Sequence, residues 1–407
     1  MRIAFFANGN AAGRNDMICR VIALHEPRRV FNHPQRLGLM EGSWLAAFEA
    51  GLAQETRLAG RMSKAKSEKA GQAHLSIHSR FMSSPHIAII DWRTAPQGDA
   101  ESAIEKGIIG SAAKVTRHLC DTDADLDDEI AGANAIIIWH NMPLTAQGIA
   151  KLTNCRAIIR NGVGFDSVDI AAARERGIAV CNVPDYGTEE VADHAIALAM
   201  ALCRQLFPLD AEAKALGWNI KVGARLRRLR ELTCGIVGLG RIGTATALRA
   251  KALGFRVVFH DPYLPNGADK AVGITRVRSL DELLAQSDVL SLHCPLNDET
   301  RHLIAERELA LLKPGAFVVN TARGGVIKKT AILAALREGR LAGAGLDVIE
   351  DEPLRSVEEA ATPNLIATCH AAFCSVESKI EMRSTSARIA LAAVTGAKLE
   401  NVVNGVE

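Results

Sequence analysis

The feature that most constrains this chain is the glycine pattern Gly-Leu-Gly-Arg-Ile-Gly at residues 238–243, directly after an apolar run and directly before an amphipathic stretch. In such a strand–turn–helix unit Gly238 makes the tight turn, and Gly240 lets the backbone approach a pyrophosphate. Gly243 allows the helix and the strand to pack closely. Free N–H groups at the helix start favour an anion there. The pattern therefore predicts a dinucleotide site, although a plain turn before a helix is the alternative.

An acidic residue, Asp261, ends the next apolar run and lies 18 residues beyond Gly243. A carboxylate at this point accepts hydrogen bonds from the adenine ribose. It also repels a 2′-phosphate, so we expect NAD as the cofactor rather than NADP. The alternative is a residue that simply ends a strand ahead of Pro262.

Apolar runs of strand length alternate with helical stretches from residue 86 onward, which indicates crossover units and parallel sheets. We predict an α/β fold with two lobes, a Rossmann-type NAD-binding domain and a flavodoxin-like substrate domain. A long helix at 188–206, with Thr188 as its N-cap, is expected to connect them. The expected strands are 86–91, 133–139, 156–160, 178–183, 233–237, 256–260, 289–293, 316–320, 344–348 and 365–368. The other expected helices lie near 100–109, 145–152, 167–176, 242–253, 280–286, 305–310, 329–338 and 378–395.

The expected domain boundaries follow from these two series. The substrate domain should cover 85–183 and 376–407, and the NAD-binding domain 184–375. Residues 1–84 carry few periodic signals, and we expect a poorly ordered extension or an over-long reading of the gene. Residues 1–81 hold 12 Lys and Arg against 6 Asp and Glu, so the remainder is mildly acidic with 36 against 40.

Composition excludes several classes of partner. An acidic main body and only two tyrosines argue against a nucleic-acid partner. No apolar run reaches about 18 residues, so no membrane span is expected. Nine irregularly spaced cysteines without a C-x-x-C pair indicate reduced thiols and a cytoplasmic location, and no metal site is expected.

Three ionisable residues follow late strands of the second series. Arg323, Glu352 and His370 should lie together, because the carboxyl ends of parallel strands face the ligand crevice. A histidine suits proton transfer to and from an alcohol oxygen, and a neighbouring carboxylate fixes its tautomer. An arginine binds a carboxylate through its rigid fork. Singly, the three have plainer explanations as a surface cation, a solvated acid and a core histidine.

A second glycine-rich segment, Asn161-Gly162-Val163-Gly164, follows the expected strand at 156–160. Its exposed backbone N–H groups would form an anion-binding nest for a carboxylate. A simple strand-to-helix turn is the alternative explanation.

Taken together, these residues resemble the D-isomer-specific 2-hydroxyacid dehydrogenase family, and most closely its C-terminal binding protein branch. The resemblance covers about residues 86–400. The motifs that carry it are Arg160-Asn161-Gly162-Val163-Gly164-Phe165-Asp166, residues 177–184, the glycine pattern at 238–243, Asn320-Thr321-Ala322-Arg323-Gly324-Gly325, Leu346-Asp347-Val348 with Glu352-Pro353, and His370-Ala371-Ala372.

The resemblance implies a role for each matching position. His370 would be the general acid/base, Glu352 its orienting carboxylate, and Arg323 the substrate-binding cation. The substrate carboxylate would also contact Gly162, Val163 and Gly164. The implied NAD-binding residues are Gly238, Gly240, Arg241, Ile242, Gly243, Asp261, Cys294, Pro295, Thr300, Thr321, Ala322 and Asp347. Among them, Ile242 would contact the pyrophosphate, Cys294 and Pro295 would line the adenine side, and Asp347 would reach the nicotinamide amide.

The implied activity is hydride transfer between NAD(H) and carbon 2 of a small D-2-hydroxy or 2-keto acid, in a homodimer. Two alternatives stay open: an NAD-responsive protein-interaction module like the C-terminal binding protein co-repressor, and a phosphoglycerate or glyoxylate/hydroxypyruvate dehydrogenase. Phe373 stands where the C-terminal binding protein branch places a tryptophan, which leaves the substrate size open. No regulatory domain is expected after residue 400.

Overall fold

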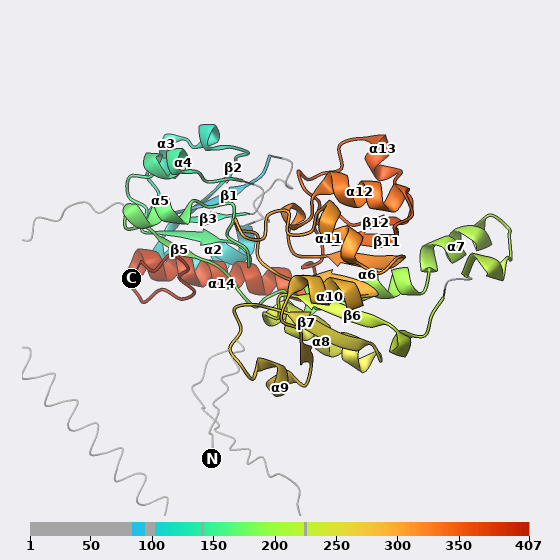
Figure 1. The fold of residues 1–407 in the computed structure, drawn as a ribbon. Coiled ribbons are helices and arrows are strands. Elements are labelled where there is room, and N and C mark those ends of the chain that lie inside the picture. Colours follow the sequence, from blue (N-terminus) through green and yellow to red (C-terminus); the bar gives the residue numbers. More distant parts are fainter. Residues whose placement is uncertain (1–83, 94–101, 140–141, 224–225, 407) are drawn as a thin grey trace, which may run out of the picture. The chain divides into compact units, whose positions relative to one another are not determined.

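Two parallel sheets organise this chain in a computed structural model that describes residues 84–93, 102–139, 142–223 and 226–406 (Figure 1). The extension expected at 1–84 lies outside these ranges except for its last residue. Both sheets belong to one unit of the chain, Phe81–Glu407. All the strand pairs within them are parallel.

The first sheet has the strand order β2-β1-β3-β4-β5, which is the order of flavodoxin-like folds. Its strands are β1 (His86–Asp91), β2 (Lys114–Leu119), β3 (Ala135–Ile138), β4 (Ala157–Arg160) and β5 (Ala179–Cys181). The Ile-rich strand β3 is buried along its whole length, as expected when helices cover both faces of a parallel sheet.

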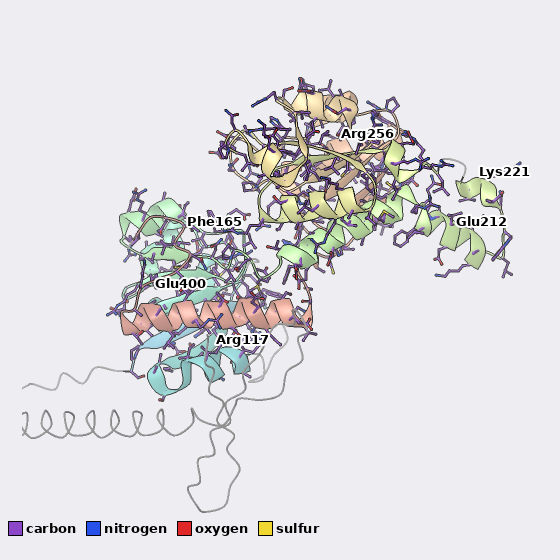
Figure 2. All side chains as sticks on the ribbon, turned by 90° about the horizontal axis from the view of Figure 1, so that it is seen from below. Arg117, Phe165, Glu212, Lys221, Arg256 and Glu400 are labelled. Atoms are coloured by element: carbon purple, nitrogen blue, oxygen red, sulfur yellow. The ribbon has the colours of Figure 1, made fainter. Side chains whose placement is uncertain are left out.

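Helices from both ends of the described sequence cover this sheet. They are α2 (Ala103–Ile109), α3 (Asp128–Ala131), α4 (Ala146–Lys151), α5 (Ile170–Glu175) and the long α14 (Val376–Thr395). Helix α14 packs on β1, β3, β4 and α2 (Figures 1 and 2). Its buried Ala387, Ile389 and Ala390 join one apolar core with these strands. After α14, the Val403 N–H donates to the carbonyl of Val180 at 2.8 Å, which ties the end of the chain to β5.

The second sheet has seven strands in the order β12-β11-β10-β9-β6-β7-β8. If β6 is counted as the first strand, the six strands β8-β7-β6-β9-β10-β11 have the order of a dinucleotide-binding fold, and β12 extends the sheet at one edge. The strands are β6 (Thr233–Val237), β7 (Arg256–His260), β8 (Thr275–Arg276), β9 (Val289–Leu292), β10 (Ala316–Asn320), β11 (Leu341–Leu346) and β12 (Leu365–Ala367). Its helices are α6 (Thr188–Cys203), α8 (Arg241–Ala252), α9 (Ala268–Val272), α10 (Leu280–Gln286), α11 (Glu306–Leu311), α12 (Lys329–Arg337) and α13 (Val357–Ala360).

Helix α6 joins the two parts of the fold and packs against α8, β10 and β11. A Cβ on Gly345 of β11 would lie 2.9 Å from the Cβ of Leu198, so glycine permits this close approach. Helix α7 (Leu206–Lys214) follows α6. Glu212 on this helix and Lys221 in the segment after it lie away from the second sheet (Figures 1 and 2).

The structure confirms the predicted fold class and most expected elements. Strands β2 and β8 were not predicted, because each is a short edge strand made mostly of polar residues. The prediction of Thr188 as the N-cap is wrong: Gly187 holds that position, and Thr188 is the first helical residue. The Thr188 N–H donates to the Asp185 carbonyl instead.

Within the described ranges no helix combines the length and the apolar character that a membrane crossing needs. The eight cysteines there all carry free thiols.

Candidate active site

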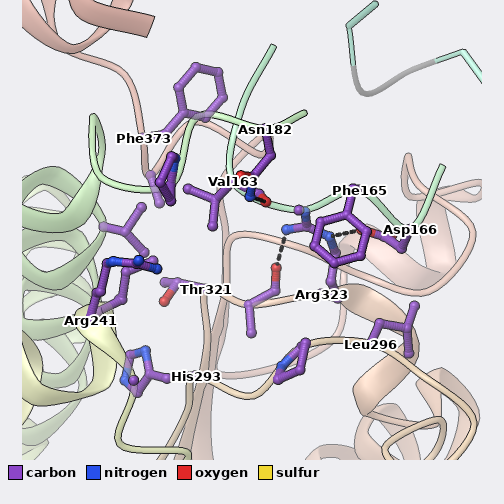
Figure 3. Close-up of a pocket in the computed structure, with 18 of the residues that line it drawn as sticks. Val163, Phe165, Asp166, Asn182, Arg241, His293, Leu296, Thr321, Arg323 and Phe373 are labelled. Carbon is purple, nitrogen blue, oxygen red and sulfur yellow. Dashed lines mark hydrogen bonds and ion pairs between the residues drawn. The ribbon is translucent and has the colours of Figure 1, made fainter. Parts of the chain in front are cut away.

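The carboxyl ends of strands from both sheets border one cavity of about 370 Å³ (Figure 3). The first sheet contributes the segments after β4 and β5, and the second contributes segments after β6, β9, β10, β11 and β12. The segments come together because parallel strands all end at the same edge of their sheet. The cavity therefore lies where ligand sites of open α/β sheets are expected.

The glycine-rich turn has the backbone geometry that the sequence predicts. Gly238 has φ +84°, and a Cβ there would lie 3.0 Å from the backbone nitrogen of Cys294. A Cβ on Gly243 would lie 2.0 Å from the Gly238 carbonyl oxygen, so this position also needs glycine. At Gly240, the N-cap of α8, no atom lies within 4 Å of the Cβ position. The turn is therefore tight at its two ends and open at Gly240.

The cavity wall beside this turn fits a dinucleotide. Of the residues expected to bind NAD, those that line it are Gly240, Arg241, Ile242, Cys294, Pro295, Thr321, Ala322 and Asp347. The Thr321 hydroxyl is buried without a hydrogen-bond partner within the described ranges. Buried polar groups normally have partners, so this hydroxyl suits a ligand. A free helix N-terminus next to it suits a pyrophosphate.

Two expected cofactor residues instead fix loops beside the cavity. Asp261 accepts hydrogen bonds from the backbone N–H groups of Leu239, at 2.9 Å, and Tyr263, at 3.0 Å. Thr300 donates from its hydroxyl to the Pro295 carbonyl at 2.6 Å. Neither residue lines the cavity, so their contacts with ribose and adenine stay predictions.

Arg323 is held at the end of β10 by its neighbours. The Asn320 amide donates to the Arg323 carbonyl at 2.9 Å and accepts from the Ala322 N–H at 3.0 Å. The guanidinium Nε donates to Asp166 at 2.9 Å (Figure 3). Asp166 follows β4, so this ion pair connects the loop of the first sheet to the second sheet.

His370 and Glu352 meet as the sequence predicts. The His370 Nδ1 lies 3.0 Å from a Glu352 carboxylate oxygen. Both residues line a second cavity of about 410 Å³ together with Arg323, and His370 and Arg323 also line the first. The three ionisable side chains therefore face a shared space, with the Nε2 edge of the imidazole opposite its carboxylate partner.

The loop that carries His370 is fastened by Asp347. His370 has φ +52°, and its N–H donates to the Asp347 carbonyl at 2.8 Å. The Asp347 carboxylate, 1% exposed, accepts from the N–H groups of Ala371 and Ala372, both at 2.9 Å, and from the Thr368 hydroxyl at 2.6 Å. Its contact with a nicotinamide amide stays a prediction, while its hold on the loop is visible.

The loop after β4 has glycines for a reason that the sequence did not reveal. A Cβ on Gly162, which has φ +145°, would lie 1.7 Å from the Arg160 Nη1. A Cβ on Gly164 would lie 1.5 Å from the Arg323 Nη2. The glycines thus make room for two guanidinium groups beside the backbone. Val163 and Gly164 line the first cavity, and Gly162 does not.

Burial shifts several pKa values around the cavity. Burial, with the Arg323 charge, lowers the pKa of Arg160 to about 10. Burial raises the pKa of Tyr186 to about 12 and lowers that of His293 to about 3. For Asp166, burial acts to raise the pKa, but the charge and hydrogen bond of Arg323 outweigh it and keep the pKa below its usual range.

Arg160, Tyr186, Asp166 and His293 line the first cavity, and the sequence analysis assigned a role to none of them. Arg160 carries a usable signal, because a charged residue that ends an otherwise apolar strand faces the ligand edge. Tyr186 and His293 carry no comparable signal, since only tertiary packing shows which way they point.

Comparisons with known proteins agree with this geometry. The family model for the D-isomer specific 2-hydroxyacid dehydrogenase NAD-binding domain matches residues 196–372. C-terminal-binding protein 1 of Caenorhabditis elegans is 33% identical, over 77% of this chain and 44% of that protein. D-3-phosphoglycerate dehydrogenase of Methanocaldococcus jannaschii is 35% identical, over 70% of this chain and 54% of that protein. The chain thus spans about half the length of these two relatives.

A crystal structure of a glyoxylate reductase from Paecilomyes thermophila superposes with a TM-score of 0.69 and 30% identity, over 79% of this chain and 99% of that one. This match includes both sheets, and the family model adds NAD as the cofactor of the second. The chain therefore belongs to the D-isomer-specific 2-hydroxyacid dehydrogenase family, and its residues 196–372 are an NAD-binding domain.

Proposed function

We propose that this chain interconverts a small 2-keto acid and the corresponding D-2-hydroxy acid. The observation that carries the proposal is the 3.0 Å contact between His370 and Glu352 beside the same cavity as the Arg323 guanidinium. The family assignment supports the D configuration. Bound NADH would supply the hydride that adds to carbon 2.

His370 moves the proton in this proposal. Its Nδ1 donates to the Glu352 carboxylate, which leaves Nε2 as the atom that faces the substrate oxygen. When the keto acid is reduced, the imidazolium gives the Nε2 proton to the carbonyl oxygen as it becomes a hydroxyl. In oxidation, the neutral imidazole takes this proton back. Glu352 acts by holding the ring and stabilising its charged form.

Arg323 and the loop after β4 orient the substrate. The Arg323 guanidinium carries the positive charge that a 2-keto carboxylate requires, and Asp166 fixes its direction through Nε. Backbone N–H groups at Val163 and Gly164 border the same cavity and are suited to the second carboxylate oxygen. With its carboxylate held there, the substrate would present carbon 2 to the nicotinamide and its oxygen to His370.

The direct test is the loss of NADH absorbance with a panel of glyoxylate, hydroxypyruvate, pyruvate and bulkier 2-keto acids. We expect turnover with at least one of them. His370→Ala should reduce kcat by at least about 100-fold while NADH binding, followed by fluorescence, is retained. Equal loss of binding and turnover would contradict the role of His370. Tight NADH binding without any turnover would refute the proposed reaction.

That last result would favour the second candidate, an NAD-responsive interaction module. The similarity to C-terminal-binding protein 1 is the observation in its favour. The His370–Glu352 pair favours turnover, because a binding module has no need of a proton-transfer group. Free thiols throughout the described ranges support a reducing, cytoplasmic location for either activity.

We also propose that the chain forms a homodimer through the arm that follows α6, which comprises α7 and residues 215–223. Leu216, Trp218 and Ile220 on this arm are 96%, 91% and 86% exposed. Large apolar side chains gathered on one exposed segment indicate a protein interface. A second copy is the occupant we commit to, since the arm belongs to the NAD-binding domain and the family resemblance implies a homodimer.

A further inference from the structure

The histidine loop comprises residues 368–375, between β12 and α14, and it contacts helix α6 at both of its ends. At the first end, the His194 Nε2 lies 3.0 Å from the Thr368 hydroxyl oxygen. At the second end, the Ser375 hydroxyl donates to the Glu190 carboxylate at 2.8 Å. Two side chains of α6 therefore hold opposite ends of the loop.

The two α6 side chains lie on one face of the helix. Glu190 and His194 are four residues apart in α6, which places them one turn apart on the same side. Both are partly buried. The start of α6 also contacts the middle of the histidine loop, since a Cβ on Gly187 would lie 3.4 Å from the Cβ of Phe373. One face of α6 thus contacts the loop at both ends and in the middle.

The direction of the first contact follows from the number of hydrogens available. A hydroxyl has one hydrogen to donate, and an ionised carboxylate has none. Thr368 therefore gives its hydrogen to the Asp347 carboxylate at 2.6 Å, and its oxygen accepts from His194. The His194 Nε2 must then carry a hydrogen. A chain of hydrogen bonds runs from His194 through Thr368 to Asp347.

The second contact uses a hydroxyl that already has a structural role. Ser375 is the N-cap of α14, and its oxygen accepts from the Ser378 N–H at 2.8 Å. Its single hydrogen is given to Glu190. The same hydroxyl therefore begins α14 and ties the end of the histidine loop to α6.

We propose that Glu190 and His194 are positioning residues that hold the histidine loop at both ends and so place the His370 imidazole. The inference rests on the proposed function, in which this imidazole moves the proton. His370 has φ +52°. A left-handed backbone at a residue other than glycine has a cost that the surrounding contacts must offset, and the contacts with α6 supply part of that stabilisation.

Turnover, and its recovery by a conservative variant, tests the first contact. His194→Leu removes the donor to Thr368, whereas His194→Gln keeps an N–H donor on a side chain of similar reach. At saturating NADH and keto acid, we expect kcat to fall by about tenfold or more in His194→Leu. In His194→Gln it should stay within about threefold of wild type. KM should change little, because neither His194 nor Thr368 lines either cavity.

A double-mutant cycle connects this loss to the hydrogen bond. Thr368→Val removes the hydroxyl that His194 contacts. Adding His194→Leu to Thr368→Val should lower kcat little further, because the partner is already absent. Losses that multiply in the double variant would overturn the assigned role of the contact.

The second contact has a matched control in the same helix turn. Glu189 and Glu190 both lie in the first turn of α6, so either change to alanine removes a charge that favours the helix start. Glu189 is exposed. Glu190→Ala should lower kcat by about threefold or more, Glu190→Gln should recover most of it through its accepting oxygen, and Glu189→Ala should leave it unchanged. An equal loss in Glu189→Ala and Glu190→Ala would overturn the role of Glu190.

Hydrogen exchange follows the histidine loop without any need for turnover. Three N–H groups of the loop donate to Asp347. In His194→Leu and in Glu190→Ala, we expect these groups to exchange about tenfold faster or more, while the peptide that covers α12 exchanges as in the wild type. Circular dichroism checks the fold, and Glu190→Ala carries the test if His194→Leu does not fold.

Two kinds of failure are distinguishable. Unchanged exchange in the histidine loop, or unchanged kcat, would overturn the inference and leave the proposed function intact. A wild-type chain that turns over none of the keto acids would refute the proposed function, and the exchange rates would still decide whether α6 holds the loop.

Discussion

Asp347→Asn should loosen the loop that positions His370. The wild-type carboxylate is 1% exposed and accepts three hydrogen bonds, from the Thr368 hydroxyl and from the Ala371 and Ala372 N–H groups. An asparagine has one accepting oxygen, so its NH₂ group must face at least one of these donors. The variant therefore loses a hydrogen bond to a charged group and leaves a buried donor unpaired. Together these cost about 2–4 kcal/mol.

The measurements are thermal unfolding and steady-state turnover. A cost of this size lowers Tm by roughly 2–6 °C in a chain of this length. Because His370 has a positive φ of 52° in the loop that Asp347 anchors, we expect a loosened loop to misplace the imidazole and kcat to fall by about tenfold or more. Asp281→Asn is the control, since Asp281 is exposed and forms a surface ion pair with Arg307. A variant with unchanged Tm and kcat would refute the anchoring role of Asp347.

Two further predictions concern other parts of the molecule. Burial lowers the pKa of His293 from 6.5 to about 3, so below about pH 6.5 the unfolded chain binds a proton that the folded chain excludes, and stability falls as the pH drops. Between about pH 7 and pH 5 this costs at most about 2 kcal/mol; denaturant unfolding of His293→Gln should show a shallower pH dependence, and an unchanged one would contradict the assignment. Trp218→Ser should raise the dimer dissociation constant, measured by sedimentation, by about tenfold or more. The same substitution should leave the stability of the monomer toward denaturant unchanged. A wild-type chain that is monomeric at all concentrations would refute the dimer.

The sequence predicts most of this fold because parallel strands buried on both faces leave long apolar runs. Strand β3, with three consecutive isoleucines, is an example. The edge strand β2 has the sequence Lys-Val-Thr-Arg-His-Leu. Its many polar residues make the sequence look like that of a loop. Helix α7 was not predicted either. Its apolar residues Leu206 and Phe207 are exposed, so the sequence shows no amphipathic pattern with a buried face.

The candidate site was predictable where chemistry constrains residue type and position together. The glycines at 238–243 and the Glu352–His370 pair are of this kind. The position of Tyr186 beside the cavity was not, because it depends on packing between segments distant in the chain. Gly162 and Gly164 show the same limit: sequence indicates a turn, and only the structure shows the guanidinium groups that the turn admits.

The return of α14 to the first sheet has a consequence for biosynthesis. All strands of the second sheet lie in one continuous stretch, from Thr233 to Ala367, that is synthesised before α14. The first sheet begins the described part of the chain, yet its core includes Ala387, Ile389 and Ala390. Its apolar face must therefore stay exposed until α14 has been synthesised. The nascent domain that is made first is completed last, and this is the stage at which we expect the chain to depend most on chaperones.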